Sequence, residues 1–116
     1  MSNISDKDIT LTKILAKEII EDKIKSNLKI AQKADQIYAF LVSSGIRTEV
    51  LWKKYNIILN LQDDLENAGI PVKAEIRKKW DETALVNQQK KLDDIVSFYK
   101  EKLINDCKIL LEEFKK

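Results

Sequence analysis

The stretch TEVLWKKYNIILNLQDDLENAGIPV, residues 48–72, decides the fold that the sequence predicts. Its apolar residues recur at helical spacing and cover roughly 220° of the circumference of a helix. A helix that packs on a single neighbour needs an apolar stripe of only about 100°. We therefore expect a helix over about 48–67, with Thr48 as its N-cap, that lies between two partner helices.

Gly69 marks the expected end of this helix. It precedes Ile70, which is the order of a left-handed glycine followed by an apolar residue that folds back on the last turn. Pro71 then suits the first turn of the next helix. Gly45, the other glycine of the chain, is expected to end the preceding helix in the same way. Both connections are therefore short, and short connections make neighbouring helices antiparallel.

The segments on both sides of these turns also carry helical patterns. A first helix is expected over about 6–44, with a kink or register change near Ser26. A third helix is expected over about 71–115, with a candidate break near 81–83, and its apolar residues follow a near-heptad seam. The sequence thus predicts one all-α domain over 1–116. This domain is an elongated antiparallel helical bundle of three long helices, or of four if the break is real.

The composition agrees with this fold and narrows the function. Only two Gly and one Pro occur in 116 residues, and 34% of the residues are charged, which is typical of long helices. Histidine is absent, which removes the commonest general base and the commonest metal ligand. The single cysteine, Cys107, is expected to be a small buried hydrophobe. No nucleophile motif, phosphate loop or metal-ligand spacing occurs, so we expect a protein that is not an enzyme and needs no cofactor or metal.

Charge and hydropathy indicate where the chain acts. The formal net charge is only +2, which gives no general preference for nucleic acid. No apolar run approaches the roughly 20 residues of a membrane span, and the N-terminus lacks the apolar core of a cleavable signal peptide. The expected location is therefore cytoplasmic, without a membrane partner.

Two features predict a surface for a protein partner. The apolar arc of the helix over 48–67 is wider than one neighbour can cover. Straight helices of about 60 Å over 6–44 and 71–115 would also extend beyond the shorter helix. Self-association into a homo-oligomer, or a protein partner of unknown identity, would cover the remainder. Packing within the core is the alternative for Trp52 and Leu59. The candidate contact residues are Trp52, Tyr55, Leu59, Trp80, Ile104 and Leu111.

The end of the helix over 48–67 is acidic. Asp63, Asp64 and Glu66 place negative charge at the negative end of the helix dipole, where each typically costs a few tenths of a kcal/mol. One explanation is that Lys73 and Arg77, just across the following turn, neutralise these carboxylates. The alternative is an acidic patch that binds a basic partner or a cation.

Basic residues follow in the segment 73–91. If the third helix is continuous, Arg77 and Lys91 lie about four turns apart on nearly the same face, with Trp80 close by. Such a stripe could follow a phosphate backbone while the indole stacks on a base. The preceding glycine turn also resembles the outline of a helix-turn-helix, although Glu75 replaces an expected apolar residue. A plain helix–helix turn is the alternative.

The sequence therefore favours a small non-enzymatic protein-interaction module, such as an adaptor, inhibitor or assembly factor. It would act by docking an apolar helical face on a protein partner. The alternative is a nucleic-acid-binding accessory protein, whose candidate residues are Lys73, Arg77, Lys78, Lys79 and Lys91.

Overall fold

The computed structural model describes residues 6–21, 26–43 and 48–114, apart from the side chains of Thr48, Leu51, Trp52 and Phe114. The expected helix end at Gly45 lies outside these residues. Regular secondary structure in the described part is helical throughout, which confirms the all-α class. The helices are α1 (Asp6–Ile20), α2 (Asn27–Ser43), α3 (Thr48–Lys54), α4 (Asn56–Asn67), α5 (Ala74–Arg77) and α6 (Glu82–Phe114).

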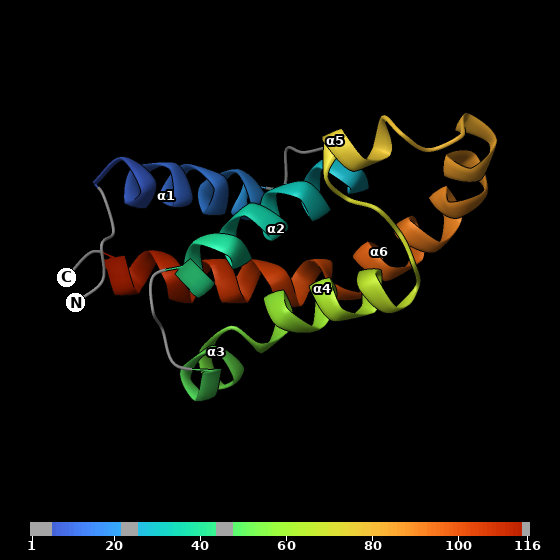
Figure 1. Ribbon diagram of the computed structural model, residues 1–116. Helices are drawn as coiled ribbons and strands as arrows, with labels where there is room; N and C mark the ends of the chain where they lie inside the picture. Colours follow the sequence, from blue (N-terminus) through green and yellow to red (C-terminus); the bar gives the residue numbers. More distant parts are fainter. Residues whose placement is uncertain (1–5, 22–25, 44–47, 115–116) are drawn as a thin grey trace.

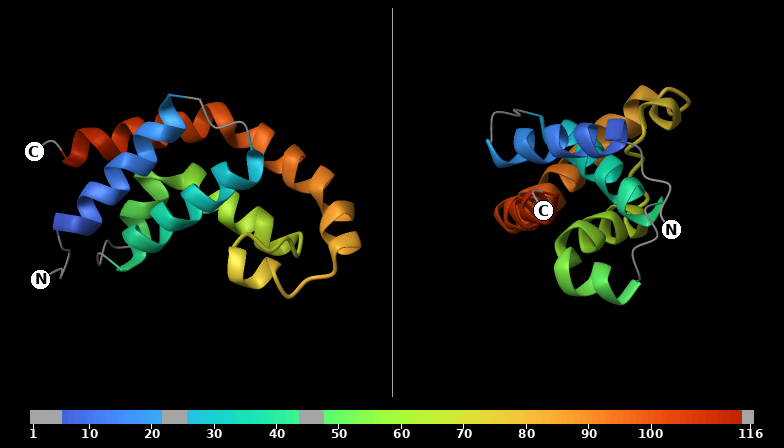
Figure 2. Two further views of the ribbon diagram at one scale, coloured as in Figure 1. Left: turned by 90° about the horizontal axis from the view of Figure 1, so that it is seen from above. Right: turned by 90° about the vertical axis from the view of Figure 1, so that its left-hand side faces the viewer.

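Four of these helices form an antiparallel bundle. α6 packs against α1, α2 and α4, and α2 also packs against α1 and α4. Successive long helices run in opposite directions, and the short helices α3 and α5 lie at opposite ends of the molecule (Figure 1). α6 curves around the other helices (Figure 2). The molecule measures 46 × 26 × 25 Å, which confirms the expected elongated shape.

The prediction of a single long helix over 6–44 is wrong. α1 ends at Ile20, and α2 begins at Asn27 and packs back against α1. The amide of Lys29 donates to Ser26 Oγ at 3.3 Å, which is an N-cap contact that starts a new helix near the expected register change. Folding back lets the apolar faces of both halves reach α6, whereas one straight helix would leave half of this surface exposed.

The helix expected over 48–67 also divides. Tyr55 has φ −128° and ψ 35°, and α4 begins at the next residue. The amides of Ile57 and Ile58 donate to Asp106 Oδ2 at 3.0 and 3.1 Å. Asp106 belongs to α6, so a residue distant in the sequence caps the first turn of α4.

Gly69 ends α4 as the sequence predicts. Its φ is +71°. The amide of Gly69 donates to the carbonyl of Glu66 at 2.9 Å, and the amide of Ile70 donates to the carbonyl of Leu65 at 3.0 Å. These are the two hydrogen bonds of a Schellman motif. Ile70 is buried, which confirms that it folds back on the helix end.

Pro71 does not start a helix, contrary to expectation. The chain stays non-helical until α5 begins at Ala74. The alternate residues Ile70 and Val72 are both buried, and the carbonyl of Val72 accepts a hydrogen bond from Gln32 Nε2 of α2 at 3.0 Å. Packing of this connection on α2 therefore prevails over the local preference of proline for a helix start.

The helix expected over 71–115 is divided as well. α6 begins at Glu82, directly after Asp81, so the candidate break near 81–83 is confirmed. The segment before the break forms only the short helix α5. Among the described residues, no helix is both long enough and apolar enough to cross a membrane.

One cluster of buried side chains joins the four bundle helices. Cys107 is fully buried, as expected from its place on the apolar seam, and burial raises the pKa of its thiol to about 12. The other buried apolar residues of this seam on α6 are Leu92, Val96, Leu103 and Leu110.

Candidate docking groove

Most contact residues expected from the sequence serve the core of the chain. Tyr55 and Leu59 are 3% and 7% exposed, because α4 lies between α2 and α6. Ile104 and Leu111 are half-buried and pack against the same cluster. The expectation that Tyr55 and Leu59 form a free surface is therefore wrong. The side chain of Trp52 lies outside the described residues.

Three hollows border the outer side of α2. One hollow of about 400 Å³ lies between α1 and α2. A second, of about 390 Å³, lies between α2 and the α4–α5 connection. A third, of about 350 Å³, lies where α2 and α4 meet this connection. Neighbouring hollows share lining residues, so we treat them as one surface and call it the α2 groove. The shared residues are Gln36 and Ala39, then Asp35, Val72 and Lys73.

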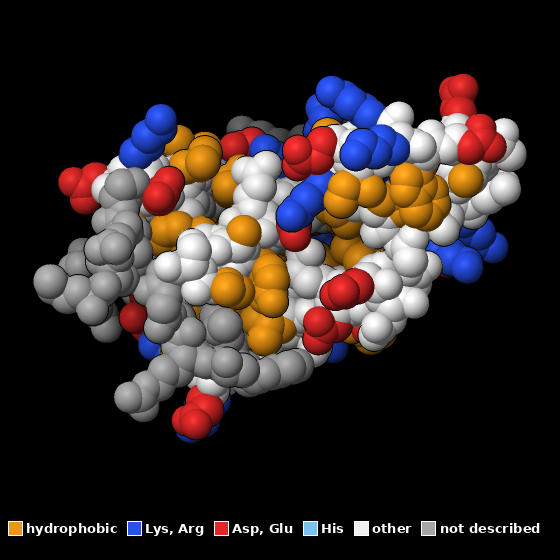
Figure 3. Space-filling view, viewed as in Figure 1, with side chains coloured by type: hydrophobic (Ala, Val, Ile, Leu, Met, Phe, Trp, Pro, Cys, Tyr) orange, Lys and Arg blue, Asp and Glu red, His pale blue; other side chains and the backbone are white. Residues whose placement is uncertain are grey.

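The α1 end of the α2 groove is apolar. Leu11 lines the first hollow together with Leu15, Ala39 and Phe40. Leu11 and Ile14 are each 49% exposed, and both also line an adjoining hollow of about 400 Å³ on α1. Figure 3 shows hydrophobic side chains gathered over α1 and α2 on this face. Large aliphatic side chains beside a hollow are typical of surfaces that bind another protein.

The α4 end of the α2 groove is acidic. Asp35, Asp63 and Glu66 line the third hollow, and Asp35 lines the second. Burial raises the pKa of Asp35, while the charge of Lys73 partly opposes this rise. Figure 3 shows acidic groups over the end of α4, beside hydrophobic surface. The apolar lining of the third hollow consists of Tyr38, Leu65, Ile70, Pro71, Val72 and Ile76.

Lys73 and Arg77 do not neutralise this acidic end by direct contact. Arg77 Nη1 instead donates to the carbonyl of Pro71 at 2.6 Å, and burial lowers the pKa of Arg77. Within the described part of the chain, neither basic residue forms an ion pair with Asp63 or Glu66. The first explanation offered by the sequence is therefore not supported by an ion pair, and of these two residues only the charge of Lys73, which lines the same hollow, acts on this end.

Asp64 differs from its acidic neighbours, because it has a partner on α6. The hydroxyl of Tyr99 donates to Asp64 Oδ2, and this hydrogen bond is the main reason why the pKa of Tyr99 rises to about 12. Asp64 therefore helps to join α4 to α6. Across the described residues, no group of three or more potential ligand side chains is close enough to hold a metal ion.

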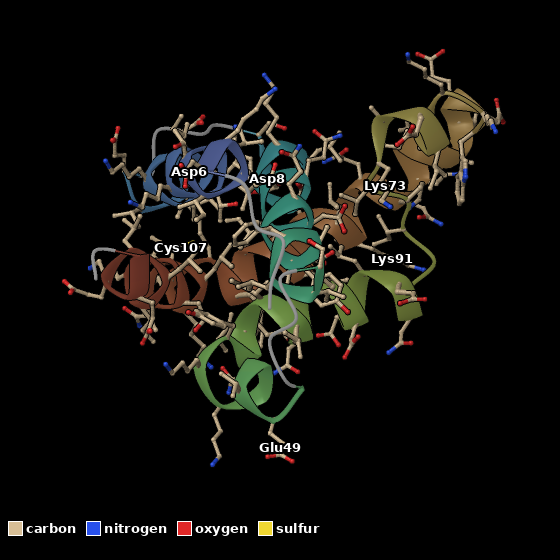
Figure 4. All side chains as sticks on the ribbon, turned by 60° about the vertical axis from the view of Figure 1, so that its left-hand side comes forward. Asp6, Asp8, Glu49, Lys73, Lys91 and Cys107 are labelled. Carbon is tan, nitrogen blue, oxygen red and sulfur yellow. The ribbon has the colours of Figure 1, made fainter. Side chains whose placement is uncertain are left out.

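The basic residues proposed for nucleic acid do not form one stripe. The break between α5 and α6 separates Arg77 from Lys91, so they share no helix face. Figure 4 places Lys73 in the connection before α5 and Lys91 on α6. Lys78 and Lys79 are exposed, and Trp80 is half-buried within the break. In Figure 3, basic groups over α5 and basic groups beside the start of α6 lie in separate patches.

Asp106 is a buried carboxylate that the sequence reading missed. It is 4% exposed, and burial raises its pKa to about 6 despite the opposing hydrogen bonds from Ile58 and Ile57. The signal was present in the sequence, because Asp106 follows Leu103 by three residues and precedes Leu110 by four. This spacing places a carboxylate on the buried seam of α6. Its two amide contacts make Asp106 a structural residue.

The chain was also compared with known proteins. No family model, no curated protein and no solved structure matches it. The case for a function therefore rests on the α2 groove.

Proposed function

We propose that this protein is a small non-enzymatic interaction module, such as an adaptor, inhibitor or assembly factor. It docks an apolar helical face, that of α1 beside the α2 groove, on a protein partner. The observation that carries the proposal is the pair Leu11 and Ile14. Scattered exposed aliphatic residues are common on any protein. These two lie one turn apart on α1. Leu11 lines two hollows and Ile14 lines one of them, and a partner's side chain placed there would bury further apolar area.

The proposed surface differs from the one expected from the sequence. α4 uses its wide apolar arc within the bundle, and the α1–α2 pair removes the uncovered helix length that argued for a homo-oligomer. Self-association through Leu11 and Ile14 is still part of the proposal's test. Light scattering over a range of concentrations gives the oligomeric state. Loss of a dimer in the Leu11→Ser variant would place the contact between copies at the groove.

Site-specific photocrosslinking tests the proposal. A photoreactive phenylalanine analogue replaces Leu11, and in a control protein it replaces Phe98, which is 68% exposed on α6 outside the groove. Both proteins are expressed in the cells that naturally make the chain. We expect a discrete protein adduct from position 11 and none from position 98. Adducts of equal yield at both positions, or none at position 11, would refute docking at this surface.

The nucleic-acid alternative has less support. It needs Lys73 and Arg77. However, Lys73 lines the acidic end of the α2 groove, and Arg77 is hydrogen-bonded to the carbonyl of Pro71. The cytoplasmic location expected from the sequence remains part of the proposal, as does the expectation that no cofactor is needed.

A further inference from the structure

We propose that the segment that occupies the α2 groove is a basic, amphipathic segment of a protein partner. Its lysine or arginine side chains would face the acidic end of the groove, and its apolar side chains would face the Leu11 end. This inference rests on the proposed function and adds the chemistry of the ligand.

The first support is the local balance of charge. The second and third hollows are lined by four carboxylates and by a single ammonium group, that of Lys73. The whole chain has a formal net charge of +2, so this balance does not reflect its composition. The concentration of negative charge would attract a cationic segment and would repel a phosphate backbone or an anionic membrane surface. The four carboxylates are Asp35, Asp63, Glu66 and Glu75.

The second support is the position of two of these carboxylates on α4. Asp63 and Glu66 are exposed, and the last turn of α4 contains no basic residue. They therefore add to the negative end of the helix dipole instead of compensating for it. A cation bound beside them would interact favourably with the carboxylates and with the negative end of the helix dipole.

The third support is the apolar lining beside these charges. Ile76 is 45% exposed and lines the third hollow with Tyr38 and Pro71. Lysine and arginine carry an apolar stem and a charged tip. Such a side chain can lay its stem on this lining while its tip reaches Asp63 or Glu66. At the other end of the groove, Leu11 and Phe40 provide surface for apolar side chains.

Two designed peptides of equal length test the charge of the ligand. The first carries leucine at helical spacing and lysine at the other positions, and the second carries glutamate in place of lysine. Binding of each fluorescein-labelled peptide to the full chain is measured by fluorescence anisotropy. We expect the lysine peptide to bind at least about tenfold more tightly than the glutamate peptide. Its affinity should fall between about 50 and about 500 mM salt.

A pair of variants tests the position of the charge. Asp63→Asn with Glu66→Gln should weaken binding of the lysine peptide about five- to tenfold, because two partly desolvated charge pairs are lost. The matched control, Asp81→Asn with Glu82→Gln, removes two adjacent exposed carboxylates outside the groove. It should change the affinity by less than about twofold.

The outcomes separate this inference from the proposed function. Equal binding of both peptides, or equal effects of the groove and control variants, would overturn the basic ligand. An adduct at Leu11 would meanwhile leave the docking function standing. Conversely, selective binding of the lysine peptide without any adduct at Leu11 would support the ligand chemistry and refute the function. A dimer that must dissociate before the lysine peptide binds would identify the occupant as a second copy, which also overturns the inference.

Discussion

The carboxylates at the two ends of α4 differ in their burial and in their interaction with the helix dipole. At its N-terminus, Asp106 is buried and accepts hydrogen bonds from the amides of Ile57 and Ile58, where a negative charge is favoured by the helix dipole. At its C-terminus, Asp63 and Glu66 are exposed, and the helix dipole disfavours their charge. The fold itself accounts for the first carboxylate. The fold gives no reason for the pair Asp63 and Glu66, which is why we assign these two carboxylates to the binding of a ligand.

Of the changes at the two ends of α4, removal of the buried carboxylate should have the largest effect on the free energy of unfolding. Asp106→Ala leaves the amides of Ile57 and Ile58 without an acceptor at a largely buried site, so we expect a loss of about 2–3 kcal/mol in the free energy of unfolding. Urea denaturation followed by circular dichroism measures it. The control is Asp94→Ala, at an exposed position of the same helix, which should change stability by less than about 0.5 kcal/mol. Similar losses in both variants would show that the cap contributes little.

The pH dependence of stability gives the next largest effect. The folded pKa of Asp106 is about 6, above the ordinary value of 3.8, so the folded state binds more protons between these values. The stabilising contribution of this proton is complete below the ordinary pKa and is lost as the pH rises through about 6.

The Asp106→Asn variant isolates this contribution, because its amide does not titrate and can still accept a hydrogen bond. Between about pH 7.5 and about pH 5, the wild type should gain about 1–2 kcal/mol relative to this variant. Urea denaturation of both proteins across this range measures the difference. A constant difference between them would show that Asp106 titrates at its ordinary pKa.

Substitutions of Gly69 test the C-terminal end of α4. Its φ of +71° strains any side-chain-bearing residue, although an added Cβ would meet no atom within 4 Å. Gly69→Ala should therefore cost about 1 kcal/mol through backbone strain alone. Gly69→Asn should cost less, because asparagine tolerates the left-handed region better. Thermal unfolding of the two variants checks this order, and a larger loss in the asparagine variant would contradict it.

Neutralisation of the exposed pair should have a small effect of opposite sign. Asp63→Asn with Glu66→Gln should raise the free energy of unfolding by about 0.3–1 kcal/mol at low salt, because it removes charge from the negative end of α4. At the start of α6, Asp81→Asn with Glu82→Gln should instead lower stability by a similar amount. Calorimetry at low and high salt checks both signs. Stability lost in the α4 variant would mean that the pair has a structural role.

The exposed lysines of the turn after α5 should give the smallest effect. Lys78→Glu with Lys79→Glu is expected to leave the affinity for DNA and RNA unchanged, since the basic residues do not share one face. A salt-titrated binding assay with duplex DNA and single-stranded RNA measures it. Affinity that falls steeply with salt in the wild type and disappears in the variant would restore the nucleic-acid alternative.

The parts of the fold that local chemistry determines could be predicted from the sequence. The end of α4 at Gly69 depends on a left-handed residue followed by an apolar one, and both are visible in the sequence. The burial of Cys107 follows from its place on a periodic seam. The break at Tyr55 could not be predicted, because its cap is Asp106 on α6. The extended connection at Pro71 was missed for the same reason, since packing on α2 holds it.

The candidate site, like the fold, could be predicted from the sequence only in part. The acidic end was visible as an alternative, because Asp63 and Glu66 oppose the dipole of their own helix. The apolar end was missed, because the exposure of Leu11 depends on how α1 folds back on α2. Conversely, the wide apolar arc of the helix over 48–67 predicted two partner helices, but the sequence did not show that both come from the same chain. Tyr55 and Leu59 were therefore assigned to a contact surface, whereas α2 and α6 cover them.

The contact between Asp106 and α4 also sets the order in which the chain can fold during synthesis. The amide of Ile57 and its acceptor lie 49 residues apart, so the first turn of α4 stays uncapped until α6 has left the ribosome. α1 must wait equally long for α6, its most extensive neighbour. A nascent chain that stalls before α6 emerges would therefore expose the apolar faces of three helices that pack on α6 in the folded protein.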